Sequence, residues 1–223
     1  MRALTVYGRV CCGAVLVLIG GIVGGGCAAD RGRGGYRVEE ELASRRQDQE
    51  ASMQRAASAM QAYRDGDLER AREGLREAVR RSDRNVSAWN ALGVVSLHLG
   101  EVGEAVGAFE RASALAPGSF EPHFNLGTAM ESIGRYGEAI TAYEASLALS
   151  PGSLEVMENL ARVYVRSGRQ PDRALALIDE ALVRESRPDW RGWLELQRLE
   201  LRRRLERPGF EPADNLAEQG GRR

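Results

Sequence analysis

The sequence contains no lysine, because all 31 of its basic residues are arginine. A chain without lysine has no phosphate-loop lysine, no Schiff-base lysine and no lysine general base. Cysteine is confined to three positions, Cys11, Cys12 and Cys27. The sequence after Cys27 therefore holds no disulfide and no thiolate metal site.

The chain also has few histidines and almost no net charge. The two histidines, His98 and His123, have no carboxylates at the spacing of a zinc site, and no serine lies in a nucleophile elbow. The formal net charge of −1 gives no electrostatic support for nucleic acid as the main partner. We therefore expect a protein that is not an enzyme, needs no cofactor or metal, and binds no nucleic acid.

The N-terminus has the charge and hydrophobicity pattern of an export signal. Arg2 and Arg9 make the first residues positively charged. An apolar run follows from Val10 to Val23, and it is short for a membrane-spanning helix, which needs about 20 residues. Three glycines then precede Cys27. This order resembles a bacterial lipoprotein signal, which implies a signal peptide over residues 1–26 and lipidation of Cys27.

One position departs from that signal, and two other interpretations stay open. Gly24 stands where lipoprotein signals usually carry Leu, Val or Ile. The segment is alternatively an uncleaved N-terminal anchor or a plain cleaved signal. Lipidation or an anchor would attach the protein to a membrane by its N-terminus. Ala28, in place of Asp, favours the outer membrane over the inner under the enterobacterial sorting rule. We expect an exported protein attached to an envelope membrane, with its folded part in the periplasm.

A repeat of 34 residues organises the middle of the chain. Segment 86–119 aligns with segment 120–153, so that Leu92-Gly93 matches Leu126-Gly127 and Pro117 matches Pro151. A third copy covers residues 154–188 with one extra residue near Pro171, and a degenerate copy covers residues 52–85. A period of this length indicates helical hairpins that bury their apolar stripes by stacking.

These positions resemble the tetratricopeptide repeat family. The copy at 86–119 carries the family residues Trp89, Leu92, Gly93, Gly100, Ala105, Phe109, Ala112 and Pro117. The resemblance implies an all-α helical-hairpin solenoid of about four repeats over residues 51–188. We expect a tether and lead-in helix at 27–50, with the Gly- and Arg-rich stretch 28–37 as flexible tether. A capping helix is expected at 189–206 and a disordered tail at 207–223.

The glycines of the repeat have two separate roles. Gly93 and Gly127 are small because the two helices of a hairpin cross there at close range. A glycine ends the first helix of each hairpin, where a left-handed conformation suits it. These turn glycines are Gly66, Gly100, Gly134 and Gly168.

The resemblance also implies a concave groove, lined by the first helix of each hairpin, that takes a protein or peptide segment. The groove residues we expect are Met53, Met60, Tyr63, Asn90, Val94, His98, Glu121, Phe124, Thr128, Glu131, Glu155, Glu158, Arg162 and Arg166. The N-terminal end is apolar and the C-terminal end charged, with Phe124 as a central anchor and Glu158 at the rim. Glu155 replaces a basic residue of the chaperone-binding carboxylate clamp, so we do not expect that activity.

The sequence thus predicts a membrane-tethered adaptor of the bacterial cell envelope that holds another protein. The alternatives are a lipoprotein that assists outer-membrane secretion or pilus assembly, and a regulatory subunit of an envelope enzyme.

Overall fold

The structure, a computed structural model, describes residues 31–207. This part of the chain contains nine helices and no strand. They are α1 (Arg31–Arg64), α2 (Leu68–Arg81), α3 (Val86–His98), α4 (Val102–Leu115), α5 (Phe120–Ser132), α6 (Tyr136–Leu149), α7 (Leu154–Ser167), α8 (Pro171–Arg184) and α9 (Pro188–Leu205). The fold is the all-α solenoid that the repeat predicts. Within residues 31–207, no helix is both long and apolar enough to cross a bilayer.

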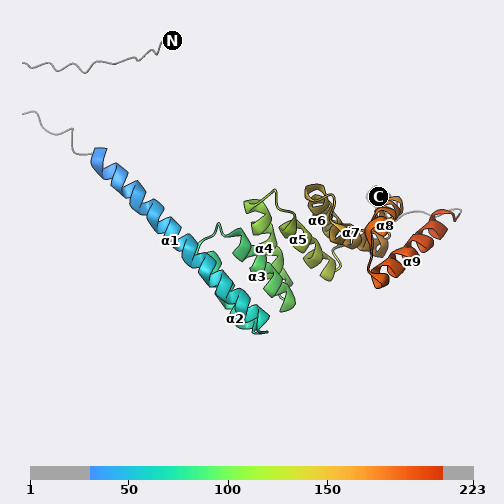
Figure 1. The fold of residues 1–223 in the computed structure, drawn as a ribbon, viewed down its shortest axis with the longest axis horizontal. Coiled ribbons are helices and arrows are strands. Elements are labelled where there is room, and N and C mark those ends of the chain that lie inside the picture. Colours follow the sequence, from blue (N-terminus) through green and yellow to red (C-terminus); the bar gives the residue numbers. More distant parts are fainter. Residues whose placement is uncertain (1–30, 208–223) are drawn as a thin grey trace, which may run out of the picture. The chain divides into compact units, whose positions relative to one another are not determined.

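The predicted signal peptide, Cys27 and all of the predicted tail except Arg207 lie outside the described residues. The chain divides into two compact units, residues 1–42 and 43–223. The second unit holds the C-terminal part of α1 and all of α2–α9. In this unit the helices succeed one another as antiparallel pairs, in the order of the sequence (Figure 1).

The start of α1 differs from our expectation. We predicted a flexible tether through Arg37, but the helix begins at Arg31 and runs to Arg64 without a break. The predicted lead-in helix and the first helix of the first repeat are therefore one helix. The residues after 37 are mostly strong helix formers, and extending an existing helix costs only about 1 kcal/mol per glycine. The glycines between 32 and 35 are therefore not enough to end it.

The hairpin turns form as the glycine pattern predicts. Gly66, Gly100, Gly134 and Gly168 all have positive φ, between 66° and 84°. The extra residue of the last repeat lies in the turn between α7 and α8, where Gln170 also has positive φ, at 43°. Pro171 follows as the first residue of α8, where its missing N–H leaves no helical bond unmade. The insertion is thus absorbed by the turn.

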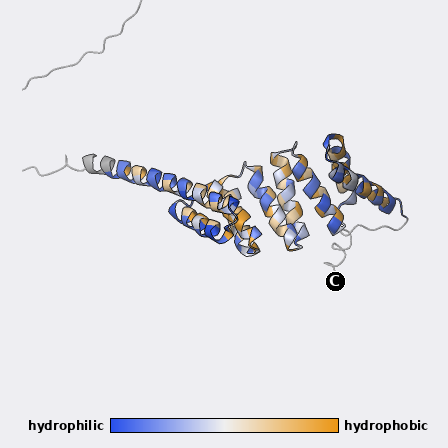
Figure 2. Cartoon of the chain, turned by 60° about the horizontal axis from the view of Figure 1, so that its bottom comes forward, coloured by the Kyte–Doolittle hydropathy of each residue, from blue (hydrophilic) through white to orange (hydrophobic). Residues whose placement is uncertain are grey.

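The close helix crossings are confirmed, and an aromatic ring fills each of the two central ones. A Cβ built on Gly127 would lie 2.6 Å from the ring of Tyr143, and one on Gly93 would lie 2.4 Å from the ring of Phe109. Both rings are completely buried. The helices of the second unit each carry polar and apolar stretches (Figure 2). The core therefore lies between the two helices of each hairpin and between neighbouring hairpins.

The last helix, α9, packs on the final hairpin as the predicted capping helix does. Leu194 and Leu201 are buried in the same cluster as Ile178 and Leu182 of α8. Leu196 and Leu199, on other sides of α9, are at least half exposed. The helix therefore covers the end of the core with one face only.

Candidate functional site

The first helix of each hairpin contacts the first helix of the next one through polar side chains. We call the surface formed by the C-terminal part of α1 with α3, α5 and α7 the first-helix face. At its N-terminal end, the Tyr63 hydroxyl lies 2.8 Å from Nδ1 of His98, and the two rings stack with centroids 5.5 Å apart. This contact joins α1 to α3.

The next contacts lie at the centre of the face. The amide nitrogen of Asn125 donates to the side-chain oxygen of Asn90 at 2.9 Å, which joins α5 to α3. Phe124 packs on Tyr143 with ring centroids 5.6 Å apart, and the hydroxyls of Thr128 and Tyr143 are 3.1 Å apart. Tyr143 belongs to the same hairpin as Phe124, so the inner side of Phe124 rests on its own repeat.

Glu131 is the charged junction between α5 and α7. This residue is only 8% exposed, and its carboxylate accepts hydrogen bonds from Arg162 at 2.9 and 3.0 Å and from Arg166 at 3.0 Å. The hydroxyl of Tyr143 donates to it at 3.1 Å. Burial raises the pKa of Tyr143 above its usual value, so this hydroxyl stays a donor. Two cations and one hydroxyl therefore fix a buried carboxylate that the sequence alone placed in an open groove.

The position of Glu158 contradicts our prediction of a rim residue. Its side chain is 2% exposed, and Arg187 donates to it at 2.6 Å and to Glu185 at 2.5 Å. Burial and the neighbouring Glu185 raise the pKa of Glu158 to about 7, against the pull of Arg187. Hydrogen bonds from Arg187 lower the pKa of Glu185. One arginine between α8 and α9 thus covers two carboxylates and removes Glu158 from any surface open to a partner.

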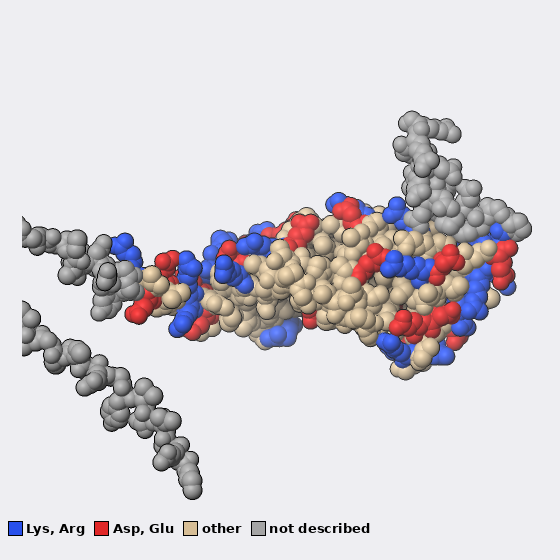
Figure 3. Space-filling view, turned by 90° about the horizontal axis from the view of Figure 1, so that it is seen from above, with Lys and Arg blue, Asp and Glu red and all other residues tan. Residues whose placement is uncertain are grey.

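Two hollows open near the ends of this face. Met53, Met60, Asn85 and Ser87 are among the residues that line the first, which has a volume of about 330 Å³. The second, of about 240 Å³, is lined by Arg162, Asp189, Trp190 and Trp193. On the side of the molecule that Figure 3 shows, charged side chains are sparse over the middle of the second unit and gather toward both of its ends.

The predicted groove residues differ in how far they reach solvent. Five are exposed, namely Met53, His98, Glu121, Glu155 and Arg166. Seven are half-buried, namely Met60, Tyr63, Asn90, Val94, Phe124, Thr128 and Arg162. Glu131 and Glu158 are buried. Glu121 bonds locally to Ser119, and Glu155 bonds through its backbone carbonyl to Asn159, so neither belongs to the contacts between repeats. A role of these residues in binding stays a prediction.

The contribution of α9 to this face was not predicted from the sequence. The ring of Trp190 lies under two guanidinium groups, of Arg187 at 5.5 Å and of Arg162 at 6.0 Å, and it meets Trp193 edge-on. Two of the three tryptophans of the chain stand three residues apart in this helix. That concentration was a usable signal, since tryptophan and arginine dominate the energetic centres of protein interfaces.

The described residues offer no group of three or more histidine, cysteine or acidic side chains that could hold a metal ion.

Comparison with known families agrees with the repeat. Two tetratricopeptide repeat models match the chain, one over residues 56–120 and 105–153 and the other over residues 132–194. Together they cover more than half of the sequence. No curated protein matches the chain.

Solved structures show the same fold. An O-GlcNAc transferase of Thermobaculum terrenum is 25% identical with a TM-score of 0.57, and the match covers 63% of this chain and 27% of that one. MamA of AMB-1 is 24% identical with a TM-score of 0.53, covering 60% and 74%. The repeat domain of Arabidopsis OM64 is 22% identical with a TM-score of 0.52, covering 53% and 98%. The chain thus corresponds to only about a quarter of the transferase.

Proposed function

Because the chain belongs to the tetratricopeptide repeat family, whose members generally mediate protein–protein interactions, we propose that it is a non-catalytic adaptor that holds a partner protein on its first-helix face. The observation that carries this proposal is the chain of contacts from Tyr63 to Arg166. These contacts hold successive first helices in fixed register and leave polar and aromatic groups at the surface. A pre-ordered surface loses little entropy when it binds.

The binding proposal has a test centred on Phe124. This ring is half-buried on Tyr143, with the polar contacts of Asn125 and Thr128 beside it. Partners would be captured by crosslinking in intact cells and identified from detergent-solubilised envelope. We expect Phe124→Ala to weaken binding of the captured partner by about 1 kcal/mol, roughly fivefold, because a central aromatic side chain is a frequent anchor.

Val183→Ala is the control, since Val183 is exposed on α8, which is not part of the first-helix face, and this change should leave the affinity unaltered. Affinity would be measured by titration calorimetry, and thermal unfolding would be measured on the same samples. If Phe124→Ala lowers only the unfolding temperature and leaves the affinity unchanged, Phe124 is a core residue and does not anchor a partner on the first-helix face.

We further propose that the adaptor is exported and tethered to an envelope membrane, with the outer membrane favoured, through a lipid on Cys27. The sequence pattern around Cys27 supports this. Stable attachment needs two or more acyl chains, since a single chain binds reversibly. An adaptor tethered in this way would keep its partner at the membrane surface.

The tether is tested with Cys27→Ser. We expect the unchanged protein to partition into the detergent phase and its mature N-terminus to begin at a lipid-modified Cys27. Cys27→Ser should shift the protein to the aqueous phase or leave the signal uncut. Mass spectrometry of the N-terminal peptide decides, and an unmodified Cys27 still preceded by Gly26 would contradict lipidation.

Two related functions stay as alternatives. The first is a lipoprotein that assists outer-membrane secretion or pilus assembly, and the second is a regulatory subunit of an envelope enzyme. The partner identified by crosslinking separates them: a secretion or pilus component favours the first, and an enzyme whose activity changes on addition of this protein favours the second.

A further inference from the structure

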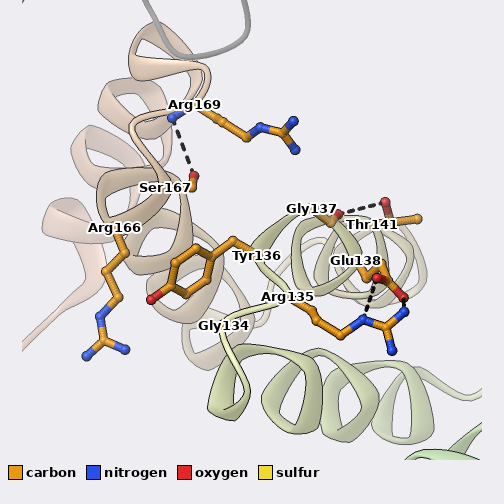
Figure 4. Close-up of a pocket in the computed structure, with 9 residues that line it drawn as sticks. All are labelled: Gly134, Arg135, Tyr136, Gly137, Glu138, Thr141, Arg166, Ser167 and Arg169. Carbon is orange, nitrogen blue, oxygen red and sulfur yellow. Dashed lines mark hydrogen bonds and ion pairs between the residues drawn. The ribbon is translucent and has the colours of Figure 1, made fainter. Parts of the chain in front are cut away.

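A third hollow lies at the turns of the last two hairpins. We call it the arginine hollow; it has a volume of about 730 Å³ and is lined by Arg135, Glu138, Arg166 and Arg169, among others. Figure 4 shows Arg166 and Arg169 on the side of α7 and Arg135 with Glu138 on the side of α6. Arg166 also bonds to Glu131 on the first-helix face. The arginine hollow therefore adjoins that face at Arg166.

The lining of the arginine hollow carries an excess of positive charge. Its one carboxylate, Glu138, is paired with Arg135 through two hydrogen bonds, at 2.5 and 2.6 Å. Arg166 donates to Glu131, but its side chain remains 55% exposed. A guanidinium group has five N–H donors, so one bond to Glu131 leaves Arg166 able to receive a further acceptor.

Arg135, which lines the arginine hollow, does not cap the helix that follows it. Arg135 occupies the N-cap of α6 without a side-chain capping bond, although N-caps favour Ser, Thr, Asp and Asn, and a cation is unfavourable at a helix N-terminus. The equivalent residue of the first hairpin is Asp67, which accepts a bond from the backbone of Arg70. A position where local chemistry is unfavourable is often one that serves function.

The small residue Gly137 accommodates another of these arginines. A Cβ built on Gly137 would lie 2.9 Å from Nη1 of Arg169, so a larger residue there would shift the flexible end of the Arg169 side chain. In the last two hairpins, the residue after the turn glycine is an arginine, Arg135 or Arg169. In the first two hairpins, the same position holds an acidic residue, Asp67 or Glu101. The two halves of the solenoid differ in charge along the same edge.

We propose that the arginine hollow binds an acidic segment of the partner protein, rich in Asp and Glu, which continues from the first-helix face past Arg166. The proposal rests on the proposed adaptor function and specifies the chemistry of its partner. Guanidinium groups bind carboxylates through two parallel hydrogen bonds. This geometry favours a ligand with several acidic side chains in a row over one whose negative charge is diffuse.

The first test uses fluorescence anisotropy with a short fluorescein-labelled peptide of alternating glutamate and glycine. We expect this peptide to bind the full chain, and a matched glutamine–glycine peptide to bind at least about tenfold more weakly. Arg166→Gln combined with Arg169→Gln should weaken binding of the glutamate peptide by at least about tenfold. Arg169→Gln alone, which keeps both arginines on Glu131, should weaken it about threefold and serves if the double variant is unstable.

The control is Arg70→Gln combined with Arg80→Gln, which removes the same charge from exposed positions on α2. We expect this pair to change binding less than about twofold. Equal losses in both pairs, or no binding of the glutamate peptide, would overturn the acidic-segment proposal. The crosslinking assay separates this failure from that of the adaptor function. If capture of the partner depends on Phe124 but not on Arg166 and Arg169, the adaptor proposal stands and the acidic-segment proposal is wrong.

Discussion

Replacing Gly127 by leucine is expected to lower the free energy of unfolding by about 3 kcal/mol or more, at the upper end of what overpacking costs. Even the first carbon of the new side chain would lie 2.6 to 2.9 Å from three atoms of the Tyr143 ring. Tyr143 cannot move aside easily, because it is fully buried and its hydroxyl bonds to Glu131. The substitution therefore forces α5 and α6 apart.

The damage should spread to neighbouring repeats. A solenoid is stabilised by the interfaces between adjacent repeats, and α5 contacts both α4 and α3 of the preceding repeat. Displacing α5 also separates Glu131 from Arg162 of the following one. Urea denaturation gives the loss of stability, and hydrogen exchange should show faster opening in α3–α4 and α7–α8 as well as in α5–α6.

The control for this substitution is Gly107→Ala. Gly107 is an exposed residue inside α4, and a Cβ there would meet nothing within 4 Å. Alanine is the better helix former, so the free energy of unfolding should rise by about 0.5–1 kcal/mol. If Gly127→Leu and Gly107→Ala shift stability by similar amounts, the close crossing of α5 and α6 is wrong.

The fold could be predicted because the repeat encodes it several times over. The turn glycines and the crossing glycines recur at the same interval. The assignment of a helix or turn in one copy is therefore supported by the equivalent residues of the other copies. The start of α1 has no such support, since Gly32 and Gly34 weaken a helix locally while the long helix after them extends it. The local composition indicated a flexible tether, but the helix formed by the residues that follow extends back through these glycines.

The site could be predicted only in part, because groove positions were assigned one helix at a time. The sequence places Glu158 on the first helix of its hairpin, but the partner that buries it, Arg187, lies 29 residues later in a loop. The contribution of Trp190 and Trp193 depends in the same way on how α9 packs. Contacts between a repeat and a helix or loop outside the repeats leave no periodic trace in the sequence.

The burial of Glu158 predicts a pH dependence of stability with a definite sign. Its pKa rises from 4.5 to about 7 on folding, so the folded chain binds more protons than the unfolded chain between these values. The stabilising contribution of Glu158 is therefore complete below pH 4.5 and is lost as the pH rises through 7. The pKa of Glu185 moves the other way, so the contribution of Glu185 is lost only as the pH falls below its unfolded value near 4.5.

Between pH 5 and pH 8, only Glu158 of this pair should change the stability. Glu158→Gln keeps a neutral side chain of the same shape beside Arg187 and Glu185, so it should remove that change. We expect the stability of the unchanged protein, relative to Glu158→Gln, to fall by about 2–3 kcal/mol across this range, since one pKa unit corresponds to about 1.4 kcal/mol. Urea denaturation at several pH values measures it.

Glu155→Gln is the matched control, because Glu155 lies three residues earlier on α7 and is exposed. Its stability should follow that of the unchanged protein at every pH, since the same chemical change is made where the carboxylate is solvated. Parallel curves for Glu158→Gln and the unchanged protein would show that burial and Glu185 do not raise the pKa of Glu158. In that case the pull of Arg187 outweighs burial, and Glu158 is charged throughout this pH range.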